Sequence, residues 1–259
     1  MDPTLRFSDR TGDYARHRPH YPPAAVDAIA DGVPRGSPAA DIGAGTGIST
    51  RLLLERGFRV SAVEPNRAMR EAGQAETAAW LAERPGCPSV HWLDATGERT
   101  TLDDASQSLV LCAQSLHWLD PAAAVTEFAR VLTRGGVACA VWNVHDTRDA
   151  AISAYREIVV RHADDPPRSP WFRNNDCALG TAAARAAGLD RYAVSTFDNA
   201  QDLDEAGLIG RAVSSSYLPR EGPARAALES DLQGLFRRYA RSGVLTFRYV
   251  CEVHRAWRR

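Results

Sequence analysis

Between residues 38 and 143, short apolar runs alternate with stretches in which apolar positions have helical spacing. Short apolar runs predict buried strands at 38–43, 58–64, 89–94, 108–114 and 135–143. Between these runs, apolar positions recur with helical spacing at about 47–56, 66–84 and 121–132. Loop and helix-stop signals separate the units at 84–88 and 133–136. Strands that alternate with helices predict a doubly wound, mostly parallel sheet, with the carboxyl ends of its strands at one ligand-binding edge.

The pattern changes after Asn143. Helical spacing is found at 148–163, 176–187, 202–213 and 223–240, and residues 164–171 are rich in proline. Strand-like patterns at 191–197 and 243–257 predict two further strands. We therefore expect an α/β, Rossmann-like fold with a seven-stranded, doubly wound, mostly parallel sheet. A helical insertion between strands five and six is expected to cap the ligand edge.

Composition and charge narrow the classes of partner and site. A net charge of −1 over 259 residues gives no electrostatic case for a nucleic-acid or membrane partner. No apolar run approaches the roughly 20 residues that span a bilayer, and the polar start of the chain is unlike a signal peptide, so we expect a cytoplasmic protein. All 31 residues counted as Lys or Arg are arginine, which excludes a P-loop and a pyridoxal Schiff base. The five scattered cysteines fit no metal site and no disulfide framework.

The segment "AADIGAGTGIST" (39–50) predicts a ligand-binding turn. A strand that ends at Ile42 leads through Gly43, Gly45 and Gly47 into a helix, so backbone N–H groups face a ligand. A dinucleotide fingerprint has its third glycine one position later, where this chain has Ile48. Asp41 would repel a pyrophosphate and suits an ammonium group, which favours a zwitterionic adenosine ligand over a dinucleotide.

Two further acids follow the next strands. Glu64 ends the second predicted strand, where a carboxylate can accept hydrogen bonds from both ribose hydroxyls. Asp94 and Ala95 follow the third strand, where they are placed to contact an adenine amino group.

Taken together, these motifs resemble a known family. The order "ADIGAGTG", "AVEPNRAM", "LDATGE" and "LCAQSLHWLD" is similar to that of class I S-adenosylmethionine-dependent methyltransferases with a methyltransferase type 11 domain. The stretches "FSDRTGDYARHRPHYP" (7–22) and "LCAQSLHWLD" resemble the small-molecule branch that includes trans-aconitate methyltransferases. The resemblance implies S-adenosylmethionine as cofactor, and a small-molecule substrate, typical of specialised metabolism, in a monomer or homodimer. It covers most of the chain but says little about the substrate.

The resemblance also implies roles for individual residues. It implies a single domain, 1–259, in which 1–35 covers the cofactor, 36–143 binds it, and 144–259 forms the substrate cap and closing strands. Asp41, Gly43 and Gly45 would hold the methionine end, and Glu64 the ribose. The adenine would lie against Pro65, Met69, Asp94 and Ala95, and Gln114 beside the sulfonium. Tyr14 and Arg18 would fold over the cofactor, with Arg18 paired to its carboxylate.

Methyl transfer requires proximity and a cavity that excludes water. Trp118 and Tyr14 can attract the sulfonium through their ring faces. His117 is a candidate general base, and the alternative is that it shapes the pocket without moving a proton. Asn143 is either a substrate ligand or a cap for the loop that follows its strand. Around the substrate we expect Trp118, Trp171, Arg173 and Tyr217, and arginines 168, 173 and 220 either bind a carboxylate or are solvated.

Two other reactions remain open at the level of the sequence. A cyclase or lyase would attack the aminobutyrate arm of the same cofactor and release methylthioadenosine. A dinucleotide-dependent oxidoreductase is the second alternative, which the spacing at Ile48 disfavours. A protein that binds the cofactor without catalysis is disfavoured by the predicted polar cavity.

Overall fold

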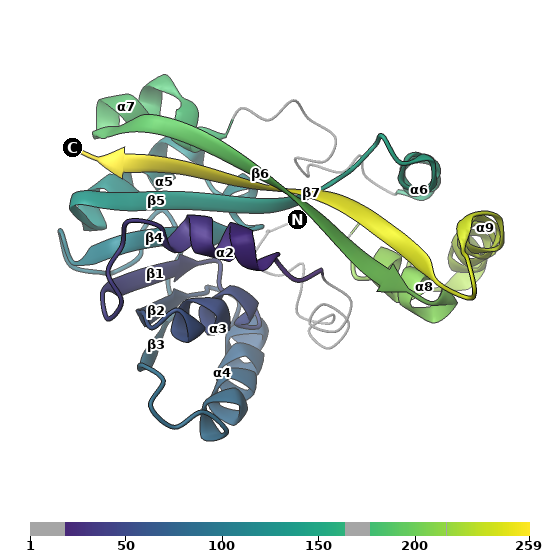
Figure 1. Cartoon of the computed structure of the whole chain (residues 1–259), viewed down its shortest axis with the longest axis horizontal. Coiled ribbons are helices and arrows are strands. Elements are labelled where there is room, and N and C mark those ends of the chain that lie inside the picture. Colours follow the sequence, from purple (N-terminus) through teal and green to yellow (C-terminus); the bar gives the residue numbers. More distant parts are fainter. Residues whose placement is uncertain (1–18, 164–176, 216) are drawn as a thin grey trace.

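A computed structural model describes residues 19–163, 177–215 and 217–259 of the chain. Its centre is a seven-stranded sheet with the order β3-β2-β1-β4-β5-β7-β6 (Figure 1). The strands are β1 (Pro38–Ile42), β2 (Arg59–Val63), β3 (Val90–Leu93), β4 (Gln107–Ala113), β5 (Leu132–His145), β6 (Leu189–Leu203) and β7 (Leu245–Arg258). Strands β1 to β5 are parallel, and β7 lies antiparallel between β5 and β6. The predicted α/β, Rossmann-like class with a mostly parallel seven-stranded sheet is confirmed.

Helices cover both faces of the sheet. One face buries apolar side chains of α2 (Pro23–Ala30), α3 (Ile48–Glu55) and α4 (Arg67–Ala82). The other face packs against α5 (Pro121–Val131) and, through the short turn η4 (Ala178–Gly180), against α7 (Ala182–Ala187). Burial on both faces explains why the central strands are continuous apolar runs in the sequence.

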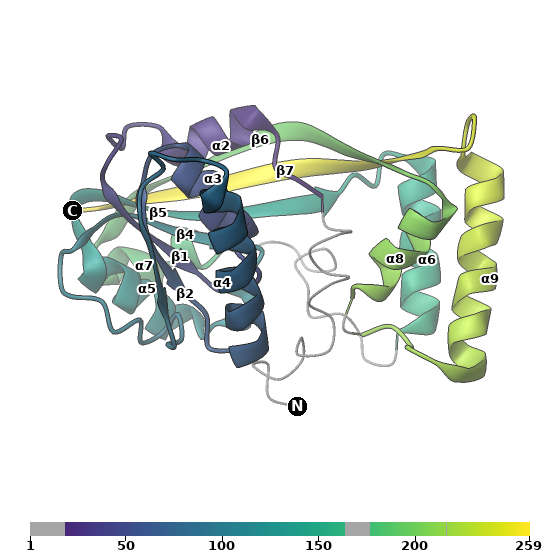
Figure 2. The ribbon, with the colours of Figure 1, turned by 90° about the horizontal axis from the view of Figure 1, so that it is seen from below.

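A second apolar core forms the cap. Its helices are α6 (Ala150–His162), α8 (Glu205–Val213) and α9 (Gly222–Tyr239), which pack around the carboxyl end of β6 and the amino end of β7. Figure 2 shows these three helices at one end of the two long strands, away from α3, α4 and α5. The predicted position between strands five and six holds for α6 only, because α8 and α9 lie in the connection between β6 and β7.

Three local differences from the predicted elements have physical causes. Helix α2, which begins after Pro22 with Pro23 at its first position, was not predicted. The predicted helix at 176–187 is divided at Thr181, whose side chain caps α7 by accepting a hydrogen bond from the N–H of Ala184. The segment 133–136, predicted to end a helix, lies inside β5 and forms a bulge. Gln107 of β4 pairs with Leu132, whereas Leu109, two residues later, pairs with Val137.

None of the helices within the described ranges has the length and apolar content needed to cross a membrane.

Candidate functional site

The glycine turn lies between β1 and α3 at the carboxyl edge of the sheet. Gly43, Gly45 and Gly47 have positive φ angles of 70°, 57° and 80°, a region that favours glycine. A Cβ atom on Gly43 would lie 2.6 Å from the Cβ of Ser115, and the Ser115 hydroxyl donates a hydrogen bond to the carbonyl of Ile42 at 2.5 Å. The turn therefore packs directly against the segment after β4.

A cavity of about 260 Å³ lies over this turn. A smaller cavity of about 50 Å³ adjoins it, and the two share Gly43, Gly45, Ala113 and Gln114. The larger cavity is lined by Gly43, Gly45, Glu64, Pro65, Asn66, Met69, Thr96, Gly97, Glu98, Ala113, Gln114, Ser115, Trp118 and Leu119. The structure thus brings seven residues predicted from the sequence to one cavity: Gly43, Gly45, Glu64, Pro65, Met69, Gln114 and Trp118.

Glu64 connects the end of β2 to the glycine turn. Its carboxylate accepts hydrogen bonds from the backbone N–H groups of Gly45 at 2.9 Å and Asn66 at 2.8 Å. Burial raises the pKa of Glu64, and the two backbone hydrogen bonds partly offset this effect. A carboxylate has about four acceptor positions, so Glu64 keeps capacity for hydroxyl donors within the cavity.

Asp41 lies beneath the turn and lines neither cavity. Its buried carboxylate accepts hydrogen bonds from the hydroxyls of Ser49, at 2.8 and 3.0 Å, and Thr50, at 2.6 Å. Burial raises the pKa of Asp41 to about 6, although these hydrogen bonds act in the opposite direction. In this structure Asp41 fixes the first turn of α3 against the end of β1.

Gln114 lines both cavities directly after β4. Its φ angle of 58° lies in the left-handed region, and its backbone N–H donates to the carbonyl of Val141 at 2.9 Å. A non-glycine residue in this region stores backbone strain, a feature that clusters at ligand sites.

The predicted adenine contacts Asp94 and Ala95 do not line the cavity. The Asp94 side chain is 70% exposed and forms a 2.8 Å ion pair with Arg70, whose other nitrogen donates to the carbonyls of Glu64 and Pro65. Ala95 is buried in the apolar core. The cavity wall beyond β3 comes instead from the next three residues, Thr96, Gly97 and Glu98.

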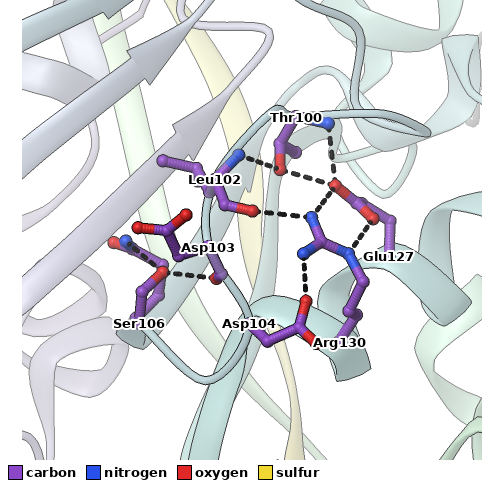
Figure 3. A network of polar contacts seen from close by, with 8 residues as sticks. Thr100, Leu102, Asp103, Asp104, Ser106, Glu127 and Arg130 are labelled. Carbon is purple, nitrogen blue, oxygen red and sulfur yellow. Dashed lines mark hydrogen bonds and ion pairs between the residues drawn. The ribbon is translucent and has the colours of Figure 1, made fainter.

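A polar network around the buried carboxylate of Glu127 holds the loop that carries these wall residues. Glu127 of α5 accepts hydrogen bonds from the N–H and hydroxyl of Thr100 at 2.8 and 2.6 Å. Figure 3 shows the Arg130 guanidinium between Glu127, Asp104 and the carbonyl of Leu102. The loop between β3 and β4 is thereby fastened to α5, a feature that the sequence analysis did not identify.

His117 and Trp118 belong to the short helical turn η2 (Leu116–Trp118) after β4. Trp118 lines the cavity, and the two rings lie 4.8 Å apart between centroids. The indole Nε1 of Trp142, on β5, donates to Nδ1 of His117 at 3.4 Å. His117 lines neither cavity and lies between Trp118 and the Trp142 side chain of β5.

Asn143 is buried and lines neither cavity. Its amide nitrogen donates to the carbonyls of Pro19 at 3.5 Å and His20 at 3.4 Å, and its oxygen accepts from Asn199 at 2.8 Å. These contacts attach the start of the described chain to β5 and β6. A substrate role for Asn143 stays a prediction.

The remaining predicted residues divide into two groups. Tyr14, Arg18, Arg168, Trp171 and Arg173 lie outside the described residues. Tyr217 is partly buried against the core of the cap, and Arg220 is exposed.

Arg211 on α8 was missed by the sequence analysis. The structure buries it completely in the cap, where its Nε donates to the Tyr249 hydroxyl at 3.2 Å. Its position between Gly210 and Ala212, in an otherwise apolar stretch, is the signal that was available in the sequence.

Comparisons with known proteins bear on this site. Residues 40–140 match the family described as a methyltransferase domain. The chain is 40% identical over 163 residues to the uncharacterised methyltransferase Rv3342 of Mycobacterium tuberculosis, which covers 63% of this chain and 62% of that relative. The chain thus matches less than two thirds of that relative's length.

Solved structures share the fold. The YcgJ protein of Bacillus subtilis has a TM-score of 0.60 at 18% identity, covering 91% of this chain and 98% of that one. A phosphoethanolamine methyltransferase of Haemonchus contortus, in complex with phosphomonomethylethanolamine and S-adenosylhomocysteine, has a TM-score of 0.53 at 13% identity, covering 91% and 51%.

Together these findings support the predicted methyltransferase domain, and the Haemonchus contortus structure holds S-adenosylhomocysteine, the demethylated form of the expected cofactor. They lend no support to a cyclase or an oxidoreductase. The trans-aconitate branch stays an expectation.

Proposed function

We propose, from the premise that residues 40–140 form a methyltransferase domain, that the chain transfers the methyl group of S-adenosylmethionine to a small molecule. The observation that carries the proposal is the cavity at the carboxyl edge of the sheet. The glycine turn forms its floor, and Glu64 and Met69 line it. These residues fit a ligand with a diol, an apolar base and a cationic end.

Each part of the cavity has a proposed role. Glu64 accepts hydrogen bonds from the ribose hydroxyls, while its contact with Gly45 keeps the turn in place. Pro65 and Met69 provide an apolar wall for the base, with Asp94 and Ala95 behind it. Gly43 and Gly45, held from below by Asp41, bind the methionine end, which Tyr14 and Arg18 cover. The sulfonium supplies an activated methyl group, and Gln114 and Trp118 orient the groups around it.

The acceptor is proposed to be a small metabolite, typical of specialised metabolism. The modest cavity volume and the small-molecule ligand of the Haemonchus contortus relative support this class. In this proposal 1–35 covers the cofactor, 36–143 binds it, and 144–259 contributes the cap and closing strands around one cytoplasmic active site, in a monomer or homodimer. Trp171, Arg173 and Tyr217 would contact the acceptor from the cap side.

Calorimetry with S-adenosylmethionine tests the cofactor site. Glu64→Ala should weaken binding at least tenfold, because hydrogen bonds to a charged group contribute about 1.5–3 kcal/mol. The matched control is Glu71→Ala on α4, an exposed glutamate paired only with Arg67 among the described residues. Unchanged affinity in Glu64→Ala would refute the ribose role, and an absence of heat with the unaltered protein would refute the cofactor.

The reaction is tested separately by mass spectrometry of the adenosine by-product, with candidate acceptors present. S-adenosylhomocysteine is the expected product of methyl transfer. Methylthioadenosine would instead show attack on the aminobutyrate arm and would overturn the proposal.

A further inference from the structure

The buried face of α4 lies along the glycine turn. Met69, Gly73 and Thr77 are the buried residues of this helix, and their spacing of four places them on one face. A Cβ atom on Gly45 would lie 3.4 Å from Cε of Met69. A Cβ atom on Gly47 would lie 2.7 Å from the hydroxyl oxygen of Thr77. The turn between β1 and α3 thus rests on α4 along this face.

At Gly73 the backbone of α4 approaches the backbone of the turn. A Cβ atom on Gly73 would overlap Cη2 of Trp92, on β3, and would lie 2.7 Å from the carbonyl oxygen of Gly45. Non-bonded carbon atoms are in optimal contact at about 3.5–4.0 Å, so neither neighbour leaves room for a methyl group. The indole is a side chain and can shift, but the carbonyl of Gly45 moves only if the turn moves with it.

Neither helix formation nor backbone conformation requires a glycine at this position. Gly73 lies in the interior of α4, where glycine is less favourable than alanine. Its φ angle is not positive, so alanine would adopt the same backbone conformation without strain. The close approach to Gly45 and Trp92 therefore accounts for the glycine.

We infer that Gly73 is a positioning residue, which sets the distance between the glycine turn and the wall of the cavity that α4 carries. The inference rests on the proposed function. Met69, on the same helix, lines the cavity at the wall proposed for the base, and Gly45 forms part of the floor proposed for the methionine end. A ligand that spans floor and wall requires this distance, whereas a ligand that contacts only the wall does not.

Calorimetry with two ligands tests this assignment. Gly73→Ala should weaken binding of S-adenosylmethionine about tenfold or more, because a displaced turn no longer reaches the methionine end while the base stays on its wall. Methylthioadenosine has the base and ribose but no amino-acid arm. Its affinity should fall less than about threefold, since Glu64 is also held by the N–H of Asn66. Unchanged affinity for S-adenosylmethionine, or equal losses for the two ligands, would overturn the inference.

The matched control is Gly234→Ala on α9. Gly234 also lies in a helix interior, but a Cβ atom there would meet only Arg237, 3.9 Å away, which is an ordinary contact. This substitution should leave both affinities unchanged. It should also raise the urea midpoint of unfolding slightly, because alanine favours the helix.

A double variant, Gly73→Ala with Trp92→Phe, separates the effect on the turn from the effect on packing. Phenylalanine lacks the outer indole atoms that the new methyl group would overlap, whereas the carbonyl of Gly45 remains. Trp92→Phe itself costs no hydrogen bond, because Nε1 of Trp92 has no partner in the described part of the chain. We expect the double variant to unfold at the urea midpoint of Trp92→Phe but to bind S-adenosylmethionine about fivefold or more weakly than Trp92→Phe does. Full recovery of affinity would show that Gly73 only packs against Trp92, and would overturn the inference.

Hydrogen exchange in the unliganded protein tests the position of the turn without the cofactor. Peptide fragments that cover 43–50 should exchange about fivefold faster or more in Gly73→Ala than in the unaltered protein, while fragments from β5 and β7 keep their rates. Unchanged exchange at 43–50 would contradict the inference. If Gly73→Ala does not fold, the double variant supplies both measurements. If the unaltered protein gives no heat with S-adenosylmethionine, the proposed function fails, and hydrogen exchange alone decides the role of Gly73.

Discussion

Asp41 illustrates how burial of a single carboxylate shapes the turn above it. Folding removes Asp41 from water, and burial raises its pKa from 3.8 to about 6. The folded state therefore binds a proton more tightly than the unfolded state. The free energy of unfolding rises as the pH falls from about 6 towards 3.8, by about 1.4 kcal/mol for each unit of pKa difference. The same burial that positions α3 thus lowers stability at neutral pH.

Asp41→Asn replaces the titrating carboxylate with a neutral amide. The free energy of unfolding of the unaltered protein, relative to this variant, should increase by about 1–2 kcal/mol between pH 7.5 and pH 5, because the amide does not titrate. Urea denaturation at both pH values measures this difference, and the comparison removes the contributions of Glu64 and the histidines to first order. A difference that stays constant with pH would show that Asp41 keeps an ordinary pKa in the folded protein.

Residues of the cavity differ in how far the sequence predicted them. Residues at strand ends, such as Glu64 and Gln114, were placed correctly at the carboxyl edge because the sheet order itself brings strand ends together. Asp94 also follows a strand, but its side chain turns to Arg70, an ion pair between two elements that no local pattern reveals. The same holds for Trp142 and His117, which lie on different elements.

At the scale of elements, the loop between β3 and β4 shows how a long connection is kept in place. Burial by itself raises the pKa of Glu127, but hydrogen bonds from Arg130 and Thr100 outweigh it and lower this pKa from 4.5 to about 2. The charged form therefore stabilises the fold above about pH 4.5, and this contribution is lost as the pH falls from 4.5 towards 2. This dependence on pH is opposite in sign to that of Asp41.

Glu127→Gln should lower the free energy of unfolding at pH 7 by about 2–3 kcal/mol, because hydrogen bonds to a charged group are lost. The difference from the unaltered protein should shrink below pH 4.5, as measured by chemical denaturation. Asp104→Asn, which alters an exposed partner of the same Arg130, should cost less than about 1 kcal/mol. Equal effects of the two substitutions would show that the Glu127 carboxylate does not anchor the loop.

The elements themselves were predictable where apolar periodicity decides their type. The strands from β1 to β4 agree with the predicted runs to within a residue or two, and the signal is clearest in β1 and β4, which are buried on both faces. Helix α2 was not predicted, because residues 1–35 were assigned only from the resemblance to the methyltransferase family and not from apolar periodicity. The bulge at Gly135, which has a φ of 78°, was predicted to be a loop, because glycines mark both loops and β-bulges in a sequence.

At the scale of the whole molecule, β6 and β7 belong to two cores at once. The ends near Leu189 and Arg258 pair with each other within the seven-stranded sheet and contribute to its core, and the opposite ends, near Leu203 and Leu245, carry the cap. Figure 2 shows both strands running continuously from one part to the other. The strands and helices were each predicted from the sequence. The packing of two cores on the same two strands was not, because the length of a strand gives no information about what packs on each end.

This arrangement predicts that the cap can be loosened with little effect on the cofactor site. Leu232 on α9 is fully buried in the cap, so Leu232→Ala should lower the free energy of unfolding by about 2–5 kcal/mol. Because no cap residue lines the cavity within the described ranges, affinity for S-adenosylmethionine should change less than twofold, while KM for the acceptor rises at least fivefold.

The control is Leu132→Ala, at the start of β5 and away from both the cap and the cavity. It should lower the free energy of unfolding by a similar amount and leave the cofactor affinity and the KM unchanged. Calorimetry and initial rates measure the two effects, and an equal loss of cofactor affinity in Leu232→Ala would mean that the cap and the cofactor site are coupled through β6 and β7.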